Sequence, residues 1–261
     1  MFGKTKHIHF VGIGGIGMSG MAELLHTLGF NISGSDKAFS ERTNHLLSLG
    51  IPIFEGHHTE NVSDCDVLVY SSAVKLDNPE IMAAQSRNIP VIRRAELLGE
   101  LLKLKPISIA VGGTHGKTST SSMLGSILTK AKVNPTLVIG GIVNDLASNT
   151  ITGSGNIILV EADEFDRTFL SLNPTMAIVT NIDLEHLDCY KNLEDLQSAF
   201  IHFANSVPFY GRSALCIDDP NVQSILPKIK RPVSTFGFSK QADVRAENIT
   251  YLKSDTSFEV I

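Results

Sequence analysis

The stretch AVGGTHGKTST, residues 110–120, decides the fold of the second half of this chain. An apolar run, ISIAVGG, precedes it, and SSMLGSILTKA follows with the spacing of an amphipathic helix. A glycine-rich turn that links a strand to a helix and ends in GK[ST] is typical of a phosphate-binding loop. Val111 stands where the usual GxxxxGK[ST] pattern has its first glycine. The context of strand and helix nevertheless favours a nucleotide-binding loop.

The chemistry of this loop follows from its residue types. Successive backbone amides can wrap phosphate oxygens, Lys117 can reach the β- and γ-phosphates, and the Thr118 hydroxyl can hold Mg²⁺. The predicted phosphate contacts of a bound nucleotide come from the loop and the first helical turn: Gly113, Thr114, His115, Gly116, Lys117, Thr118 and Ser119.

A second glycine-rich loop, VGIGGIGMSG at residues 11–20, lies near the start of the chain. Gly12, Gly14 and Gly17 match GxGxxG between a predicted strand and a predicted helix, where a diphosphate can approach the backbone closely. Asp36 ends the next predicted strand, at the place of the ribose-binding acid in NAD-dependent proteins. A phosphorylated ligand is therefore predicted here, and an NAD-dependent oxidoreductase is one alternative. A tight turn without a ligand is another.

Strand-like and helical segments alternate along the whole chain, which is typical of parallel sheets covered by helices. We predict an α/β protein with a Rossmann-like, parallel-sheet domain at residues 1–105. A P-loop ATPase-like α/β domain follows at residues 106–261. The last residues, TSFEVI, are predicted to be an unfinished strand, so the second domain is expected to be incomplete at its C-terminal end.

Composition and charge exclude several classes of partner. The chain has 22 Lys and Arg against 27 Asp and Glu, a formal charge of −5, and no long basic run. Nucleic acid and anionic membranes are therefore not expected as partners. The N-terminal segment lacks the pattern of a signal peptide or a membrane span, and the three cysteines are far apart. These features indicate a cytoplasmic protein with reduced thiols.

Two further positions follow apolar strands. Glu161 closes IILV as the acid of a Walker B strand does, and could hold Mg²⁺ directly or through water. The alternative is an acid in a solvated or capping position within EADEFD. His186 lies in NIDLEHLD after AIVTN, and spacing alone favours an ordinary surface histidine.

The sequence resembles the Mur ligases of bacterial cell-wall synthesis, and among them the alanine-adding branch. The similarity runs in order through HFVGIGGIGMSGMAELL, GSD, VLVYSSAV, NPEI, IPVIRRAELLGELL, GGTHGKTSTSSML, VEADEFDRTFLSLNP and NIDLEHLDCY. The family's loop has the form GT[HN]GKT, which accounts for Val111. In this family the N-terminal domain binds a UDP-sugar and the central domain binds ATP, so the resemblance implies one ligand for each loop.

The resemblance also implies residue roles. Lys117, Glu161 and His186 would be catalytic, with Thr118, Glu161 and His186 holding two magnesium ions. The UDP-sugar would be contacted by Gly14, Gly15, Ile16, Gly17, Asp36 and Ser71. The implied reaction is ATP-dependent joining of L-alanine to the carboxylate of UDP-N-acetylmuramate through an acyl phosphate.

Within the family one alternative stays open, and beyond it the NAD-dependent oxidoreductase remains the rival interpretation. A ligase that adds a whole peptide to the same sugar is the nearest competitor. It stays open because, in this family, a C-terminal domain largely selects the acceptor. That domain is expected to be absent here, so residues 1–261 alone are expected to be inactive. A GTPase-type switch would need a guanine-specific NKxD stretch, which the sequence does not contain.

Overall fold

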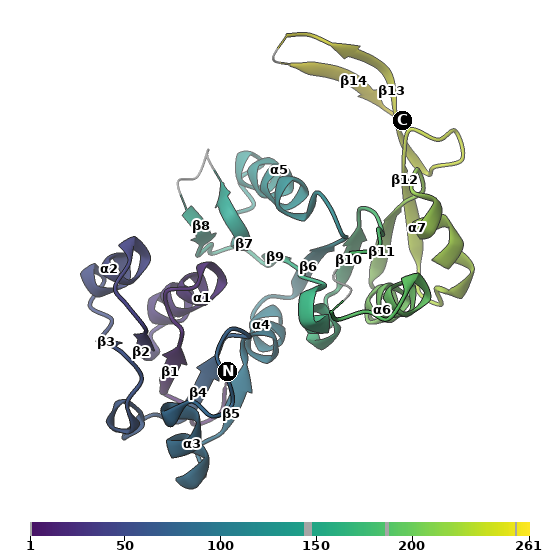
Figure 1. The fold of residues 1–261 in the computed structure, drawn as a ribbon. Coiled ribbons are helices and arrows are strands. Elements are labelled where there is room, and N and C mark those ends of the chain that lie inside the picture. The colour runs from purple at the N-terminus through teal and green to yellow at the C-terminus, as the bar shows by residue number, and fades with distance from the viewer. Residues whose placement is uncertain (1, 144–147, 186–187, 254) are drawn as a thin grey trace. The chain divides into compact units, whose positions relative to one another are not determined.

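The computed structural model describes residues 2–143, 148–185, 188–253 and 255–261. The chain divides into two compact units (Figure 1). Unit 1 consists of Met1–Pro106 and Ser122–Leu159, and unit 2 of Ile107–Ser121 and Val160–Ile261. Among the described residues, no helix combines the length and the apolar character needed to cross a bilayer.

The first sheet, in unit 1, has five parallel strands in the order β3-β2-β1-β4-β5. The strands are β1 (His7–Val11), β2 (Asn31–Asp36), β3 (Ile53–Glu55), β4 (Val67–Tyr70) and β5 (Val91–Arg93). This is the Rossmann order 3-2-1-4-5-6 for its first five strands, and in that fold ligands bind at the carboxyl ends of the strands. The predicted Rossmann-like sheet is confirmed.

Local signals in the sequence account for the helices between these strands. The helices are α1 (Ile16–Thr27), α2 (Glu41–Ser48), α3 (Pro79–Ser86) and α4 (Arg94–Leu102). Ser40 caps α2 through the Thr43 amide, and Asn78 caps α3 just before Pro79 at its first position. Gly29 and Gly50 follow α1 and α2 with φ of +90° and +85°, which glycine adopts without strain.

A polar network lies within the core of unit 1. Glu80 is fully buried and accepts hydrogen bonds from Ser35 Oγ at 2.5 Å and Asn61 Nδ2 at 2.6 Å, and its Oε1 lies 3.7 Å from Nε2 of buried His9. Burial raises the pKa of Glu80, but the nearby His9 ring and the hydrogen bonds from Ser35 and Asn61 outweigh it, so the pKa lies below its ordinary value. His9 thus has a structural partner in the fold.

Unit 1 also contains a hairpin that the sequence analysis did not assign. Strands β7 (Thr136–Val143) and β8 (Ser148–Ile151) pair antiparallel, with Leu137 opposite Ile151 and Val138 opposite Thr150. Leu137 and Val138 are buried. This hairpin is antiparallel, whereas the five-stranded sheet of the same unit is parallel.

Unit 2 is built on a mixed sheet, in which six strands run in the order β14-β13-β12-β11-β10-β6. They are β6 (Ile107–Gly112), β10 (Met176–Val179), β11 (Arg212–Cys216), β12 (Val233–Gly237), β13 (Val244–Tyr251) and β14 (Thr256–Val260). Neighbours from β6 to β13 pair parallel, whereas β13 and β14 pair antiparallel. The strand predicted for the last residues is confirmed as β14, and Figure 1 shows it in a hairpin with β13.

Strand β9 (Ile157–Glu161) ends beside β6, where the amide of Ala162 donates to the Val111 carbonyl at 2.8 Å. The carboxyl ends of β6, β9 and β10 therefore meet at one edge, and the three segments predicted to carry chemistry follow these ends.

Aromatic side chains fill the core beneath this edge. Phe200 and Phe203 of α6 (Leu193–Asn205) contact Phe169 of the 3-10 segment η3 (Phe165–Ser171), with ring centroids 5.1 and 5.2 Å apart. A Cβ on Gly112 would lie 3.0 Å from the Phe203 ring. The strand before the phosphate loop is therefore held tightly against α6.

Candidate functional site

The phosphate loop joins β6 to α5 (Lys117–Lys130) and needs its glycines. Gly113 has a φ of +139°, and a Cβ there would lie 1.9 Å from Thr180 Oγ1. Gly116 has a φ of +78°. Both conformations favour glycine, and they allow the loop to turn tightly into the start of α5, where helix amides can face an anion.

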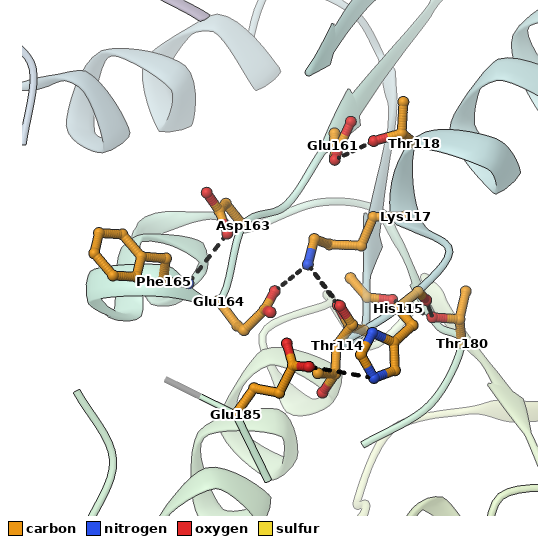
Figure 2. Close-up of polar contacts among 12 residues, drawn as sticks. Thr114, His115, Lys117, Thr118, Glu161, Asp163, Glu164, Phe165, Thr180 and Glu185 are labelled. Carbon is orange, nitrogen blue, oxygen red and sulfur yellow. Dashed lines mark hydrogen bonds and ion pairs between the residues drawn. The ribbon is translucent and has the colours of Figure 1, made fainter. Parts of the chain in front are cut away.

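Lys117, the first residue of α5, folds back over the loop. Its ammonium donates to the carbonyls of Gly113 at 2.9 Å and Thr114 at 3.2 Å, and to Glu164 Oε2 at 2.5 Å (Figure 2). The Lys117 side chain is 14% exposed, so the ammonium is positioned at the loop rather than extended into solvent. A cation held in this way can neutralise phosphate charge.

Thr118 and Glu161 form the second polar pair of the loop. The Thr118 hydroxyl donates to Glu161 Oε1 at 2.8 Å (Figure 2). The two oxygens lie on different elements, α5 and the end of β9. In the part of the chain that the structure describes, no three His, Cys, Asp or Glu side chains gather around a metal position. A hydroxyl with one carboxylate suits Mg²⁺, which usually keeps waters and substrate phosphates as its other ligands.

The segment after β10 fixes the middle of the phosphate loop. The His115 amide donates to Asn181 Oδ1 at 2.8 Å, and the His115 carbonyl accepts from Thr180 Oγ1 at 2.7 Å. Asp183 donates its amide to Thr114 Oγ1 at 2.9 Å. These bonds span more than sixty residues of sequence, and spacing along the chain gave no signal for Thr180, Asn181 or Asp183.

The His115 ring points toward acids on the same segment. Its Nε2 lies 3.4 Å from Asp183 Oδ2 and 3.7 Å from Glu185 Oε1, and all three side chains are about half exposed or more. Figure 2 shows His115 beside Glu185. His186, the predicted metal ligand, lies outside the described residues. Ser119 is exposed in the first turn of α5.

Glu164 is a site residue that sequence reasoning missed. It lies three residues after Glu161 in a run that looks solvated, yet its side chain is 1% exposed and pairs with Lys117. The Glu164 carbonyl accepts from the hydroxyl of buried Tyr190 at 2.6 Å. The sequence gives no signal for the contact between Glu164 and Lys117, because a run of acids such as EADEFD is typical of an exposed segment.

The glycine loop of unit 1 lies between β1 and α1. The amides of Gly12 and Ile13 donate to the Ser35 carbonyl at 2.9 and 3.0 Å, and the Gly14 amide donates to Asp36 Oδ2 at 2.7 Å. A carboxylate therefore already accepts a hydrogen bond from this loop, close to the start of a helix. This is direct evidence that the loop offers an amide to an anionic oxygen.

The remaining predicted residues surround the same loop. Ile16 begins α1 and is 41% exposed, with Gly15 as the N-terminal cap residue. A Cβ on Gly12 would lie 3.0 Å from Ser71 Oγ, and one on Gly17 would lie 2.5 Å from a guanidinium nitrogen of Arg94. The structure thus brings Asp36 and Ser71 to the glycine loop of unit 1, while Lys117, Thr118 and Glu161 gather in unit 2.

Comparisons with known protein families cover almost the whole chain. Residues 7–106 match the model described as "Mur ligase family, catalytic domain", and residues 111–261 match the "Mur ligase middle domain".

Individual relatives agree with these matches. The chain is 51% identical to UDP-N-acetylmuramate--L-alanine ligase of Syntrophus aciditrophicus over 98% of its length and 53% of that protein. A solved UDP-N-acetylmuramate-alanine ligase from Thermotoga maritima is similar with a TM-score of 0.83 at 33% identity, over 97% of this chain and 57% of that one. The Neisseria UDP-N-acetylmuramate:L-alanyl-gamma-D-glutamyl-meso-diaminopimelate ligase gives a TM-score of 0.87 at 28% identity, over 98% and 84%. The chain spans about half the length of the curated relatives it matches.

Proposed function

The chain belongs to the Mur ligase family, and we propose that it carries the ATP and sugar-nucleotide sites of a ligase that joins L-alanine to the carboxylate of UDP-N-acetylmuramate. The observation that carries the proposal is the pair of phosphate-binding loops, one in each unit. The loop of unit 2 positions a lysine ammonium and lies beside two oxygens that would hold a metal, whereas an amide of the unit 1 loop donates to a carboxylate oxygen.

The loop of unit 2 is the proposed ATP site. Residues 113–119 would surround the phosphates, although the amides of Thr114 and His115 donate to Asn181 and would have to exchange these bonds for phosphate. Lys117 would contact the phosphoryl group that is transferred. Thr118 Oγ1 and Glu161 would hold Mg²⁺, which supplies charge neutralisation between the β- and γ-phosphates. We further propose His186 as a ligand of a second magnesium ion, because the family resemblance assigns a histidine at this position to that role.

The loop of unit 1 is the proposed UDP-sugar site. The amides of Gly14, Gly15, Ile16 and Gly17 would contact the diphosphate at the N-terminus of α1, with Ser71 beside them. The Gly14 amide would have to exchange its hydrogen bond to Asp36 for one to the diphosphate, or donate to both oxygens. An NAD-dependent oxidoreductase, the alternative drawn from this loop alone, would leave the phosphate loop of unit 2 without a function.

The proposed reaction forms an amide at the cost of ATP. A carboxylate oxygen of the sugar attacks the γ-phosphorus of ATP, and the bond to the ADP oxygen breaks. The amine of alanine then attacks the acyl carbon, phosphate leaves, and the amine loses its proton. Lys117 would stabilise charge on the transferring phosphoryl group, and the loop amides would orient it. We place the reaction in the cytoplasm, where ATP and the sugar nucleotide are available.

A peptide-adding ligase is the second candidate, since the Neisseria enzyme shares the fold over nearly the whole chain. The name of that enzyme places a tripeptide, and not an amino acid, on the same sugar nucleotide. Among the solved structures the identity is 33% to the alanine ligase against 28% to the peptide ligase, and it is 51% to a curated alanine ligase, which favours alanine.

A substitution in the glycine loop tests whether the two loops bind different ligands. Gly14→Asp places a Cβ 2.8 Å from Asp36 Oδ2 and adds a negative charge where the diphosphate is expected. We expect UDP-N-acetylmuramate affinity to fall on the order of 100-fold, with ATP affinity unchanged. Calorimetric titration of both ligands measures this.

The matched control is Asn31→Asp, which adds one negative charge at the opposite end of β2. It should leave both affinities at their wild-type values. If Gly14→Asp weakened both ligands equally while the protein stayed folded by circular dichroism, the two-ligand assignment would be wrong.

A further inference from the structure

The ammonium of Lys117 has as many acceptors in this structure as it has donors. A lysine ammonium offers three N–H groups. Lys117 Nζ lies within hydrogen-bond distance of the Gly113 carbonyl at 2.9 Å, the Thr114 carbonyl at 3.2 Å and Glu164 Oε2 at 2.5 Å. A phosphate oxygen can therefore contact the ammonium only if one of these three bonds is released or shared.

The burial of the partners decides which bond is released. The Glu164 side chain is 1% exposed, and removing its cation would leave a buried carboxylate without its compensating charge. The Thr114 carbonyl is neutral and makes the longest of the three bonds. The contact that Lys117 exchanges for phosphate is therefore expected to be the one to Thr114, while the ion pair with Glu164 persists.

The backbone of Glu164 is held in place by two hydrogen bonds. Its carbonyl accepts from Tyr190 Oη at 2.6 Å and from the Arg167 amide at 3.0 Å. Burial raises the pKa of the Tyr190 phenol, so it retains the proton that it donates. The Arg167 guanidinium covers the Tyr190 ring, 4.8 Å from its centroid, and pairs with Asp195.

We propose that Glu164 is the positioning residue of the phosphate loop: it keeps the charged ammonium of Lys117 at the place where a nucleotide phosphate arrives. The inference rests on the proposed function, because it assumes that ATP binds at this loop. The two acids of the EADE run then have different roles: Glu161 contacts Thr118, and Glu164 contacts Lys117 (Figure 2). Glu164 itself would touch neither nucleotide nor metal.

Nucleotide binding with and without magnesium tests the inference. Glu164→Gln keeps the size of the side chain and removes its charge, so we expect affinity for ADP to fall roughly tenfold or more. The loss should be the same in the presence of Mg²⁺ and of a chelator, since it acts through Lys117. Glu161→Gln should weaken ADP only when Mg²⁺ is present. Calorimetric titration measures both.

Conservative and control variants separate positioning from support of the fold. Glu164→Asp keeps the charge on a shorter side chain and should recover part of the affinity. Glu194→Gln removes a charge from an exposed acid in the first turn of α6 and should bind ADP normally. Thermal unfolding reports the structural effect of each variant separately.

Several results would overturn the inference. Unchanged ADP affinity in Glu164→Gln, with or without a lower melting temperature, would show that Glu164 only supports the fold. Tighter binding would show that it competes with phosphate for Lys117. Failure of the wild-type chain to bind any adenine nucleotide would instead refute the proposed function, and the role of Glu164 would fall with it.

Discussion

Lys117→Met is expected to lower turnover of the ligase by about 10³-fold and to lower ATP affinity by less. The substitution keeps the length and apolar body of the side chain and removes the ammonium that lies over the phosphate loop. In the proposed reaction this charge meets the γ-phosphate as the carboxylate attacks it, so its loss affects the transition state more than the ground state. Nucleotide titration and steady-state phosphate release measure the two effects.

Lys130→Met is the matched control for this prediction. Lys130 is the last residue of α5, is exposed, and undergoes the same chemical change at the far end of the same helix. The activity of the Lys130→Met variant should equal that of the wild type. Because Lys117 neutralises buried Glu164, the melting temperature of Lys117→Met must be measured as well. The activities are then compared at a temperature where both variants are folded. Turnover within threefold of the wild type would remove Lys117 from the mechanism.

Glu161→Ala is expected to lower turnover on the order of 10³-fold at ordinary magnesium concentrations. The variant removes the carboxylate that accepts the Thr118 hydroxyl at 2.8 Å, and with it one of the two proposed oxygen ligands of the metal. Affinity for magnesium falls, and so does the neutralisation of charge between the β- and γ-phosphates. The activity should rise again, in part, as magnesium is increased well above its wild-type requirement.

A magnesium titration of phosphate release is the measurement for Glu161→Ala, with Glu194→Ala as the control that removes an exposed acid. The wild type and the control should saturate at the same magnesium concentration. A variant that lost activity without any change in its magnesium requirement would place Glu161 outside the metal site.

The order of strands and loops could be predicted from the sequence because local chemistry marks them clearly. The glycines at 12, 14 and 17, the GKT at 116–118 and Glu161 after an apolar run each identify the end of a strand. Parallel strands bring their carboxyl ends to one edge of a sheet. The structure accordingly brings Thr118 to Glu161, and Asp36 to the loop that contains Gly14.

The contacts that complete the site depend on tertiary structure and leave little local signal. Glu164 is buried and pairs with Lys117, and its carbonyl accepts from Tyr190, although the run that contains it consists largely of acids. Asn181 reaches the His115 amide because β10 pairs with β6, a relation between segments that periodicity does not fix. The antiparallel β7 and β8 were missed because the pattern of alternating strands and helices gave no reason to expect a hairpin.

The central claim is that the two loops serve one ligase reaction, and phosphate release by the whole protein tests it most directly. The assay contains ATP, Mg²⁺ and UDP-N-acetylmuramate with one acceptor at a time: L-alanine, glycine, L-serine or the tripeptide of the Neisseria enzyme. We expect release only when all components are present, and the highest kcat/KM with L-alanine. Release that is independent of the sugar nucleotide, or that requires the tripeptide and ignores L-alanine, would contradict the account.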